Sequence, residues 1–344
     1  MRSVEAQARG VLATLRSGHP TARALAISDS RAFVRSVFLA SAVRSGLLRA
    51  LAFPRSLAEL AAQAQCARLE RLEAWLEVGV ELGELRREGD RYLARGRRAR
   101  ALAAGDPVLE AHYRSILDYQ AGPYEELEAR LRDAPGAGRD DLERHADVIA
   151  RVSLAAAPFV VPYLDAVVAE VRPARALDVG SGTGIYVRAL LEADPGLHVE
   201  GVDLASDVVA DARADLAAAG LADRAELHVA DVRTWTPPAG RPRFELITLL
   251  NAVYYFPRED RPALYGRLGS LLTDGGELVV VTMSRAGSIA SAHLHFMLSC
   301  EAGAASLPEA SELVLDLGRA GYGVVEERTL VPTEPFVAIR ARRN

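Results

Sequence analysis

The chain has 344 residues, half of them hydrophobic and a quarter charged, which is ordinary for a globular protein with a substantial core. All 41 basic residues are arginine, and the two cysteines, Cys66 and Cys300, are too few for a disulfide framework. This cysteine usage favours a reducing cytoplasm. We find neither a leading apolar segment nor an apolar run that approaches the length of a bilayer, so we expect no signal peptide and no membrane span.

The first 105 residues combine helical periods with a hairpin signal. Helical periodicity, together with a capping box at Ser56–Glu59, predicts helices over residues 4–17, 31–53, 56–63 and 68–83. Two short strands around a Gly-Asp turn are expected at residues 84–94. Helices followed by such a hairpin are typical of a winged-helix module, which we expect over residues 1–105.

Winged helices often bind DNA, and this segment carries 18 arginines against 10 acids although the whole chain has a net charge of −5. The helix that would enter a DNA groove nevertheless carries four acids, Glu70, Glu73, Glu77 and Glu81. Acids facing phosphates repel them, so the sequence disfavours nucleic acid as a partner.

Residues 106–165 are expected to form a helical linker. Helices lie around a Pro/Gly break at residues 134–138, and the helical period resumes over residues 149–171. Clefts form at domain junctions, so this linker is expected to line a substrate pocket, with Tyr119 among its contacts.

The rest of the chain, residues 166–344, alternates strand and helix signals, which predicts a parallel α/β sheet. Strands are expected at residues 174–180, 198–203, 225–230, 244–250 and 277–283, and helices at 183–193, 206–219, 259–272, 288–300 and 308–320. Two closing strands, at residues 322–329 and 334–340, are too close together for a crossover and should pair antiparallel.

A glycine-rich turn follows the first of these strands. Residues 178–184 read Asp-Val-Gly-Ser-Gly-Thr-Gly, where the dinucleotide fingerprint would need a further glycine at position 185, which is Ile185. Such a turn lets the backbone approach a ligand closely. The carboxylate of Asp178 favours a ligand that carries an ammonium group and would repel a pyrophosphate.

Two further acids end the next two strands. Asp203 can accept hydrogen bonds from both hydroxyls of a ribose, and Asp231 is placed to accept from an adenine amino group. These acids and the turn together resemble the class I methyltransferases that use S-adenosylmethionine (SAM). The resemblance implies a Rossmann-like seven-stranded sheet and a cofactor site formed by Asp178, Gly180, Ser181, Gly182, Gly184, Asp203, Leu204, Asp231, Val232 and Asn251.

The small-molecule O-methyltransferases of this class place a winged-helix dimerisation module before the catalytic domain and a catalytic His-Asp pair after the fourth strand. In this sequence Tyr254 and Tyr255 stand where that pair is expected. Tyr254 is therefore a catalytic candidate and Tyr255 a substrate contact, although both tyrosines also fit a role as core residues at a pocket rim.

Two histidines lie on the helix expected at residues 288–300. His293 shares an apolar stripe with Ile289 and is a candidate base, although a lone histidine on an apolar face is more often just a packed residue. His295, on another face, is a substrate candidate. No metal site is inferred, because the other histidines show no ligand spacing.

The sequence thus predicts a cytoplasmic, homodimeric SAM-dependent methyltransferase of a small metabolite, with O-transfer favoured. C- or N-transfer to an enolisable or amine acceptor is one alternative. A winged-helix, SAM-responsive DNA-binding regulator is the other.

Overall fold

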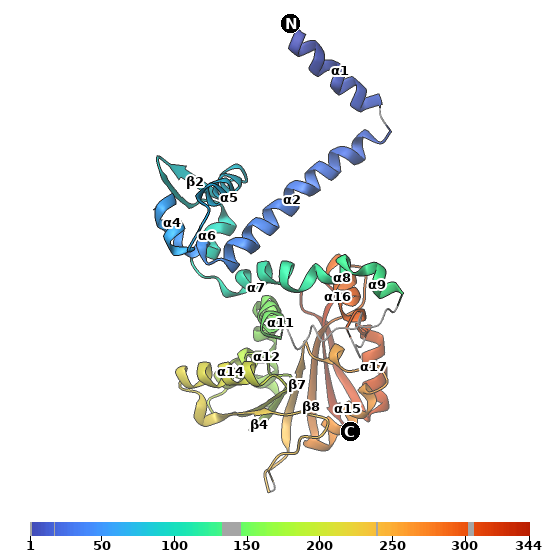
Figure 1. Cartoon of the computed structure of the whole chain (residues 1–344). Helices are drawn as coiled ribbons and strands as arrows, with labels where there is room; N and C mark the ends of the chain where they lie inside the picture. The colour runs from blue at the N-terminus through green and yellow to red at the C-terminus, as the bar shows by residue number, and fades with distance from the viewer. Residues whose placement is uncertain (1, 17, 133–145, 239, 302–305) are drawn as a thin grey trace. The chain divides into compact units, whose positions relative to one another are not determined.

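The computed structural model describes residues 2–16, 18–132, 146–238, 240–301 and 306–344 (Figure 1). The chain divides into two compact units, Met1–Asp118 and Tyr119–Asn344. Each unit has its own apolar core. One cluster of buried side chains lies within the first unit, and two others lie within the second.

The first unit contains the expected helices and hairpin. Its elements are α1 (Arg2–Arg16), α2 (Pro20–Arg44), α3 (Leu47–Ala50), β1 (Arg55–Ser56), α4 (Leu57–Gln63), α5 (Leu69–Glu81), β2 (Leu85–Glu88), β3 (Arg91–Ala94), α6 (Arg97–Ala103) and α7 (Pro107–Ser115). The strands form a small antiparallel sheet in the order β1-β3-β2. The predicted capping box is confirmed, since Ser56 Oγ accepts from the Glu59 amide at 3.3 Å and Glu59 Oε2 accepts from the Ser56 amide at 2.7 Å.

The single helix predicted over residues 31–53 is wrong in its bounds. α2 begins at Pro20 and ends at Arg44, and the short α3 follows. The break falls at Gly46, which adopts a left-handed conformation with φ of 70°. A glycine in this conformation ends a helix without the steric cost of a Cβ.

Beyond α7 the chain passes through a π-helical turn, Ile116–Gln120, into α8 (Gly122–Glu125) and α9 (Leu127–Leu131). The Pro/Gly break predicted at residues 134–138 lies outside the described residues. The helical period over residues 149–171 is realised as α11 (Ala146–Ser153), a 3₁₀ turn and α12 (Ala157–Val171).

The expectation that no apolar run approaches the length of a membrane span is wrong. Val148–Val171 is long and apolar enough to cross a bilayer. Its second half is instead a core helix, because Val160, Leu164 and Val167 pack into the apolar cluster that covers the sheet. Core helices of soluble proteins pass the same test of length and composition, so the run is weak evidence for a span.

The second unit is built on the predicted seven-stranded sheet. Its strands are β4 (Arg175–Val179), β5 (His198–Asp203), β6 (Ala225–Val229), β7 (Phe244–Leu250), β8 (Leu272–Met283), β9 (Tyr322–Thr329) and β10 (Phe336–Arg343), in the order β6-β5-β4-β7-β8-β10-β9. The first five pair in parallel and β10 pairs antiparallel with both β8 and β9, which confirms the predicted closing hairpin.

Helices cover both faces of this sheet (Figure 1). They are α12, α13 (Ile185–Ala193) and α14 (Ser206–Ala218) on one face, and α15 (Arg261–Leu271) and α17 (Ala310–Arg319) on the other. A further helix, α16 (Ile289–Ser299), follows β8. Since strands β4 to β8 run parallel, the residues that follow them gather at one carboxyl edge, where ligands bind in sheets of this kind.

Candidate active site

The turn between β4 and α13 brings the backbone into close contact with two neighbouring segments. Gly180, Gly182 and Gly184 all adopt left-handed conformations, with φ of 71°, 49° and 74°. A Cβ at Gly180 would lie 2.8 Å from the Cβ of Ala252, and one at Gly184 would lie 3.0 Å from the Cβ of Ala212. Only glycine satisfies both requirements at these positions.

The carboxylate of Asp203 holds this turn at the end of β5. Asp203 Oδ2 accepts from the Gly182 amide at 2.8 Å, and Oδ1 accepts from the Ala205 amide at 2.9 Å. Each carboxylate oxygen has a second lone pair, so these bonds leave acceptor capacity for a ligand. The next residue, Leu204, is 70% exposed.

Asp178, at the carboxyl half of β4, is buried and only partly satisfied. Its Oδ1 accepts from the Thr248 hydroxyl at 2.6 Å, whereas its Oδ2 has no hydrogen-bond partner within the described part of the chain. The loss of solvation, together with the charge of Asp203, raises the pKa of Asp178 to about 7. Buried polar groups are nearly always paired, so an unpaired carboxylate oxygen here fits a site for a cationic ligand group.

Two hydroxyls near Asp178 are likewise buried without a hydrogen-bond partner among the described residues. They are Ser181 Oγ and Tyr186 Oη. Burial, together with the charge of Asp178, raises the pKa of Tyr186. Sequence reasoning missed Tyr186, although its place two residues after the last glycine of the turn is a usable signal.

Asp231 and Val232 follow β6, as expected, but the carboxylate of Asp231 is already engaged. It accepts from the Arg233 side chain, at 3.0 Å from Nε and 2.7 Å from Nη2, and from the Arg233 amide at 2.9 Å. These hydrogen bonds hold the pKa of Asp231 below its ordinary value. Val232 is buried in the core, and the adenine role of Asp231 stays a prediction.

Asn251 follows β7 in a left-handed conformation with φ of 54°, which asparagine tolerates better than most residues. Its amide donates to the carbonyl of Val281 at 2.7 Å. The next residue is Ala252, whose Cβ faces Gly180. Asn251 therefore immediately precedes the residue that packs against the glycine turn.

Tyr254 and Tyr255 lie in a short 3₁₀ turn, Val253–Tyr255, after β7. Their rings meet edge to face with centroids 4.7 Å apart, and their hydroxyls share a hydrogen bond. Tyr254 is 7% exposed and packs against Leu298 and Leu307, whereas Tyr255 is 37% exposed. Burial raises the pKa of Tyr254 well above its ordinary value, so its phenol stays protonated at neutral pH and can donate a hydrogen bond.

Two other tyrosines lie close enough to Tyr254 to influence it electrostatically. They are Tyr119, before α8, and Tyr186, after the glycine turn. Desolvation around its hydroxyl, with the charges of Asp203 and Glu301, likewise raises the pKa of Tyr255 to about 12. The structure thus places Tyr119 and Tyr186 within electrostatic range of Tyr254, which contacts Tyr255.

The two candidate histidines on α16 have different surroundings. His293 Nδ1 lies 2.8 Å from the Tyr124 hydroxyl, and burial lowers the pKa of His293. Nδ1 of His295 is buried without a partner among the described residues. The expected inward stripe through Ile289 is wrong at that residue, which is 90% exposed because it occupies the first position of the helix.

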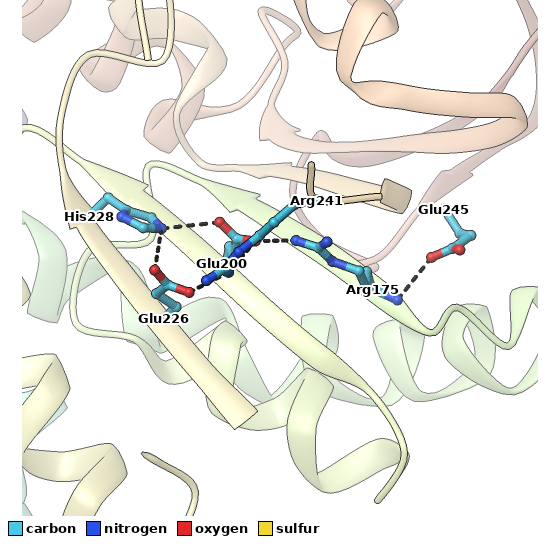
Figure 2. Close-up of polar contacts among 6 residues, drawn as sticks. All are labelled: Arg175, Glu200, Glu226, His228, Arg241 and Glu245. Carbon is cyan, nitrogen blue, oxygen red and sulfur yellow. Dashed lines mark hydrogen bonds and ion pairs between the residues drawn. The ribbon is translucent and has the colours of Figure 1, made fainter. Parts of the chain in front are cut away.

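A separate polar cluster lies near the amino edge of the sheet (Figure 2). The buried carboxylate of Glu200 accepts from Arg175, from Arg241 at 3.3 Å and from His228 Nε2 at 3.1 Å. Glu226 also pairs with Arg241. Sequence spacing missed this meeting of His228 with two carboxylates, because they come from adjacent strands.

Glu200, Glu226 and His228 are close enough for their ligand atoms to reach one ion. Two arginines already neutralise the two glutamates, however, and a cation would have to displace Arg241 from both of them. The cluster therefore reads as an ion-pair network that joins β4, β5 and β6 to the loop before β7.

Comparison with known proteins agrees with this geometry. The family model described as "Methyltransferase domain" matches residues 176–276, the stretch that holds the glycine turn and the three acids. Residues 176–276 form a methyltransferase domain. The predicted class I architecture is confirmed, and S-adenosylmethionine is the cofactor of this domain class. No curated protein matches the sequence of the chain.

Solved structures share the fold over nearly the whole chain. A mitomycin 7-O-methyltransferase is 18% identical, with a TM-score of 0.75 over 94% of this chain and 99% of its own. Human N-acetylserotonin methyltransferase, solved with SAM, is 15% identical, with a TM-score of 0.72 over 96% and 99%. An N,N-8-amino-8-demethyl-D-riboflavin dimethyltransferase from Streptomyces davawensis is 19% identical, with a TM-score of 0.70 over 96% and 100%.

The role of Asp203 can be tested with cofactor binding. We expect Asp203→Ala to weaken the binding of S-adenosylhomocysteine by on the order of 2–3 kcal/mol, because charge-assisted hydrogen bonds to the ribose are lost. Isothermal titration calorimetry measures the change, and Asp207→Ala, an exposed acid on α14, is the matched control. Equal affinity of the Asp203 variant and the wild type would refute the placement.

The raised pKa of Asp178 predicts a pH-dependent stability. Between 3.8 and about 7 the folded state binds a proton that the unfolded chain has released, so the wild-type free energy of unfolding falls as pH rises through that window. Asp178→Asn cannot titrate, and without cofactor its stability relative to wild type should grow across the window, by on the order of 4 kcal/mol in total.

Urea unfolding without cofactor at several pH values measures this difference, with Asp207→Asn as the surface control. A stability difference between Asp178→Asn and wild type that stays constant with pH would show that Asp178 has an ordinary pKa in the folded protein.

Proposed function

We propose that the chain transfers the methyl group of SAM to a small-molecule acceptor, and that the acceptor atom is a hydroxyl oxygen. The observation that carries this proposal is the set of unpaired buried polar atoms around Asp178 beside the glycine turn, within the methyltransferase domain. Bound SAM supplies an electrophilic methyl group on its sulfonium. The protein then has to position the acceptor and exclude water.

The assignment of cofactor contacts follows from charge. The carboxylate of Asp178 suits the ammonium group, and Asp203 has lone pairs for the ribose hydroxyls. Asp231 would accept from the adenine amino group, beside the apolar side chains of Leu204 and Val232. Ser181 and Asn251, together with the three glycines, would contact the methionine part.

On the acceptor side, the tyrosines supply hydrogen-bond donors. Tyr254 would orient the acceptor through Tyr255, and Tyr119 and His295 would line the pocket. His293 has a lowered pKa and is neutral at pH 7, so it can take up a proton. Because the phenol of Tyr254 stays protonated, His293 is the better of the two catalytic candidates as a base.

The choice of oxygen as acceptor atom rests on similar structures that are named O-methyltransferases, among them a family protein from Burkholderia thailandensis and the mitomycin enzyme. The riboflavin-analogue enzyme, in contrast, is named an N,N-dimethyltransferase. C- or N-transfer to an enolisable or amine acceptor is therefore the second candidate. Regiochemistry of a methylated product, read by NMR, separates these outcomes.

We further propose a division into residues 1–105 for dimerisation, 106–165 as pocket-lining linker and 166–344 for catalysis, acting in the cytoplasm as a homodimer. Exposed apolar side chains on α1 and α2 support self-association; they are Val11, Leu12, Leu15, Leu25, Ile27, Phe33 and Val34. Sedimentation equilibrium should give a dimer for the wild type and a monomer for Ile27→Asp combined with Phe33→Asp. A double variant that remains dimeric like the wild type would contradict this interface.

Formation of S-adenosylhomocysteine tests the activity itself. Purified protein is incubated with SAM and a panel of phenolic, enolic and amine acceptors, and the product is quantified by mass spectrometry. Acceptor-dependent formation supports the proposal. Retention of labelled SAM without any product would instead indicate a cofactor-binding protein without transfer activity.

The buried hydroxyl of Tyr254 gives a kinetic prediction. Tyr254→Phe removes a donor to Tyr255 while keeping the ring, so turnover should fall about tenfold with SAM affinity unchanged. Steady-state rates together with calorimetry measure both quantities, and Tyr92→Phe, buried in the core of the first unit, is the control. Equal turnover of Tyr254→Phe and wild type would assign Tyr254 to packing alone.

A further inference from the structure

A three-membered polar chain joins the segment around α8 to α16 in the second unit. The Tyr124 hydroxyl lies 2.8 Å from His293 Nδ1, and His293 Nε2 lies 3.3 Å from Gln120 Oε1. The rings of Tyr124 and His293 stack with centroids 5.7 Å apart and planes 13° apart. Figure 1 shows α8 beside α16. Both nitrogens of the imidazole are thus engaged by side chains from one short segment.

The partner of Nε2 decides which nitrogen of His293 carries the proton. Gln120 faces Nε2 with its carboxamide oxygen, which can only accept a hydrogen bond. With the carboxamide in this orientation, the compatible neutral tautomer of His293 has its proton on Nε2 and its lone pair on Nδ1. The Tyr124 hydroxyl consequently donates to Nδ1, the arrangement in which a base activates a hydroxyl and a third group orients the base.

Exposure decides which of the three side chains, Tyr124, His293 or Gln120, an acceptor can reach. His293 is half-buried with both nitrogens occupied, whereas Tyr124 is 53% exposed. These three side chains are also linked to Tyr254, since Tyr119 precedes Gln120 and acts electrostatically on Tyr254. Leu294, next to His293, packs against the cluster that contains Tyr254.

We propose that Tyr124 is the residue that deprotonates the acceptor hydroxyl, with His293 as the base behind it and Gln120 as a positioning residue. This inference rests on the proposed methyl transfer. As the acceptor oxygen forms its bond to the methyl carbon, the carbon–sulfur bond breaks and its electron pair stays on sulfur. The acceptor proton passes to Tyr124 Oη, and the phenolic proton passes to His293 Nδ1, which leaves an imidazolium.

The surroundings of His293 are compatible with this proton uptake. Burial alone lowers the pKa of His293, so the imidazole is neutral before the reaction. On α16 the nearest titratable group is His295. From α9, Arg130 donates to the carbonyl of Cys300 at 2.8 Å, and Glu301 follows; neither contributes to the pKa shift of His293.

The tautomer of His293 can be measured without an acceptor. Two-bond ¹⁵N–¹H spectra of histidine-labelled protein, bound to S-adenosylhomocysteine, report which nitrogen is protonated, and His293→Gln identifies the signal. We expect the Nε2–H tautomer, with a shift of the Nδ1 resonance in Tyr124→Phe. An Nδ1–H tautomer would overturn the proposal, because Tyr124 would then be an acceptor from His293.

Kinetics with two probe acceptors test the relay itself. Phenol, with a pKa of about 10, needs a base at neutral pH, whereas 4-nitrophenol ionises near neutrality and needs one much less. Tyr124→Phe and His293→Gln should slow methylation of phenol by about 100-fold and that of 4-nitrophenol by less than about tenfold. Gln120→Ala should move the acid limb of the pH–rate profile, and His198→Gln, an exposed histidine, should leave the profile unchanged.

Equal slowing of both probes in Tyr124→Phe would show a structural role and overturn the relay. If neither probe is methylated, the tautomer measurement decides the proposal. The proposed function fails separately, through loss of S-adenosylhomocysteine binding by the wild type or through absence of product with every acceptor tested.

Discussion

The site depends on one steric constraint, the close contact of the glycine turn with Ala252 and Ala212. A Cβ at Gly180 would collide with Ala252, and one at Gly184 would crowd Ala212 in a left-handed backbone conformation, so glycine is strongly favoured at both positions where the chain leaves β4 and enters α13. The same turn donates the Gly182 amide to Asp203 and so fixes the carboxylate at the end of β5. Local backbone geometry thereby sets the positions of two ligand-binding groups at once.

Burial raises the pKa of both Asp178 and Tyr254, with different consequences for the site. It leaves Asp178 with one unpaired oxygen and a pKa near neutrality, which favours a cationic ligand group. It keeps the phenol of Tyr254 protonated and so removes it as a base. In the proposed reaction the proton of the acceptor goes to a group of lower pKa, and His293, in contact with Tyr124, has that property.

The sequence could predict features that depend on local patterns. The strand ends at Asp178, Asp203 and Asp231, and the antiparallel hairpin, follow from periodicity and loop length. The break at Gly46 was missed because the apolar period continues through it, and only backbone geometry ends the helix there. Contacts between distant segments carry no such signal, as with Tyr124 and His293, which lie 169 positions apart.

The cluster around Glu200 shows why residue types alone do not define a site. Glu200, Glu226 and His228 have the side chains of a metal centre, yet Arg175 and Arg241 match the two negative charges (Figure 2). The unpaired oxygen of Asp178 has no such cation near it among the described residues. Buried carboxylates in one sheet thus differ according to whether the protein itself supplies the counter-charge, and the uncompensated Asp178 is the one that fits a cationic ligand group.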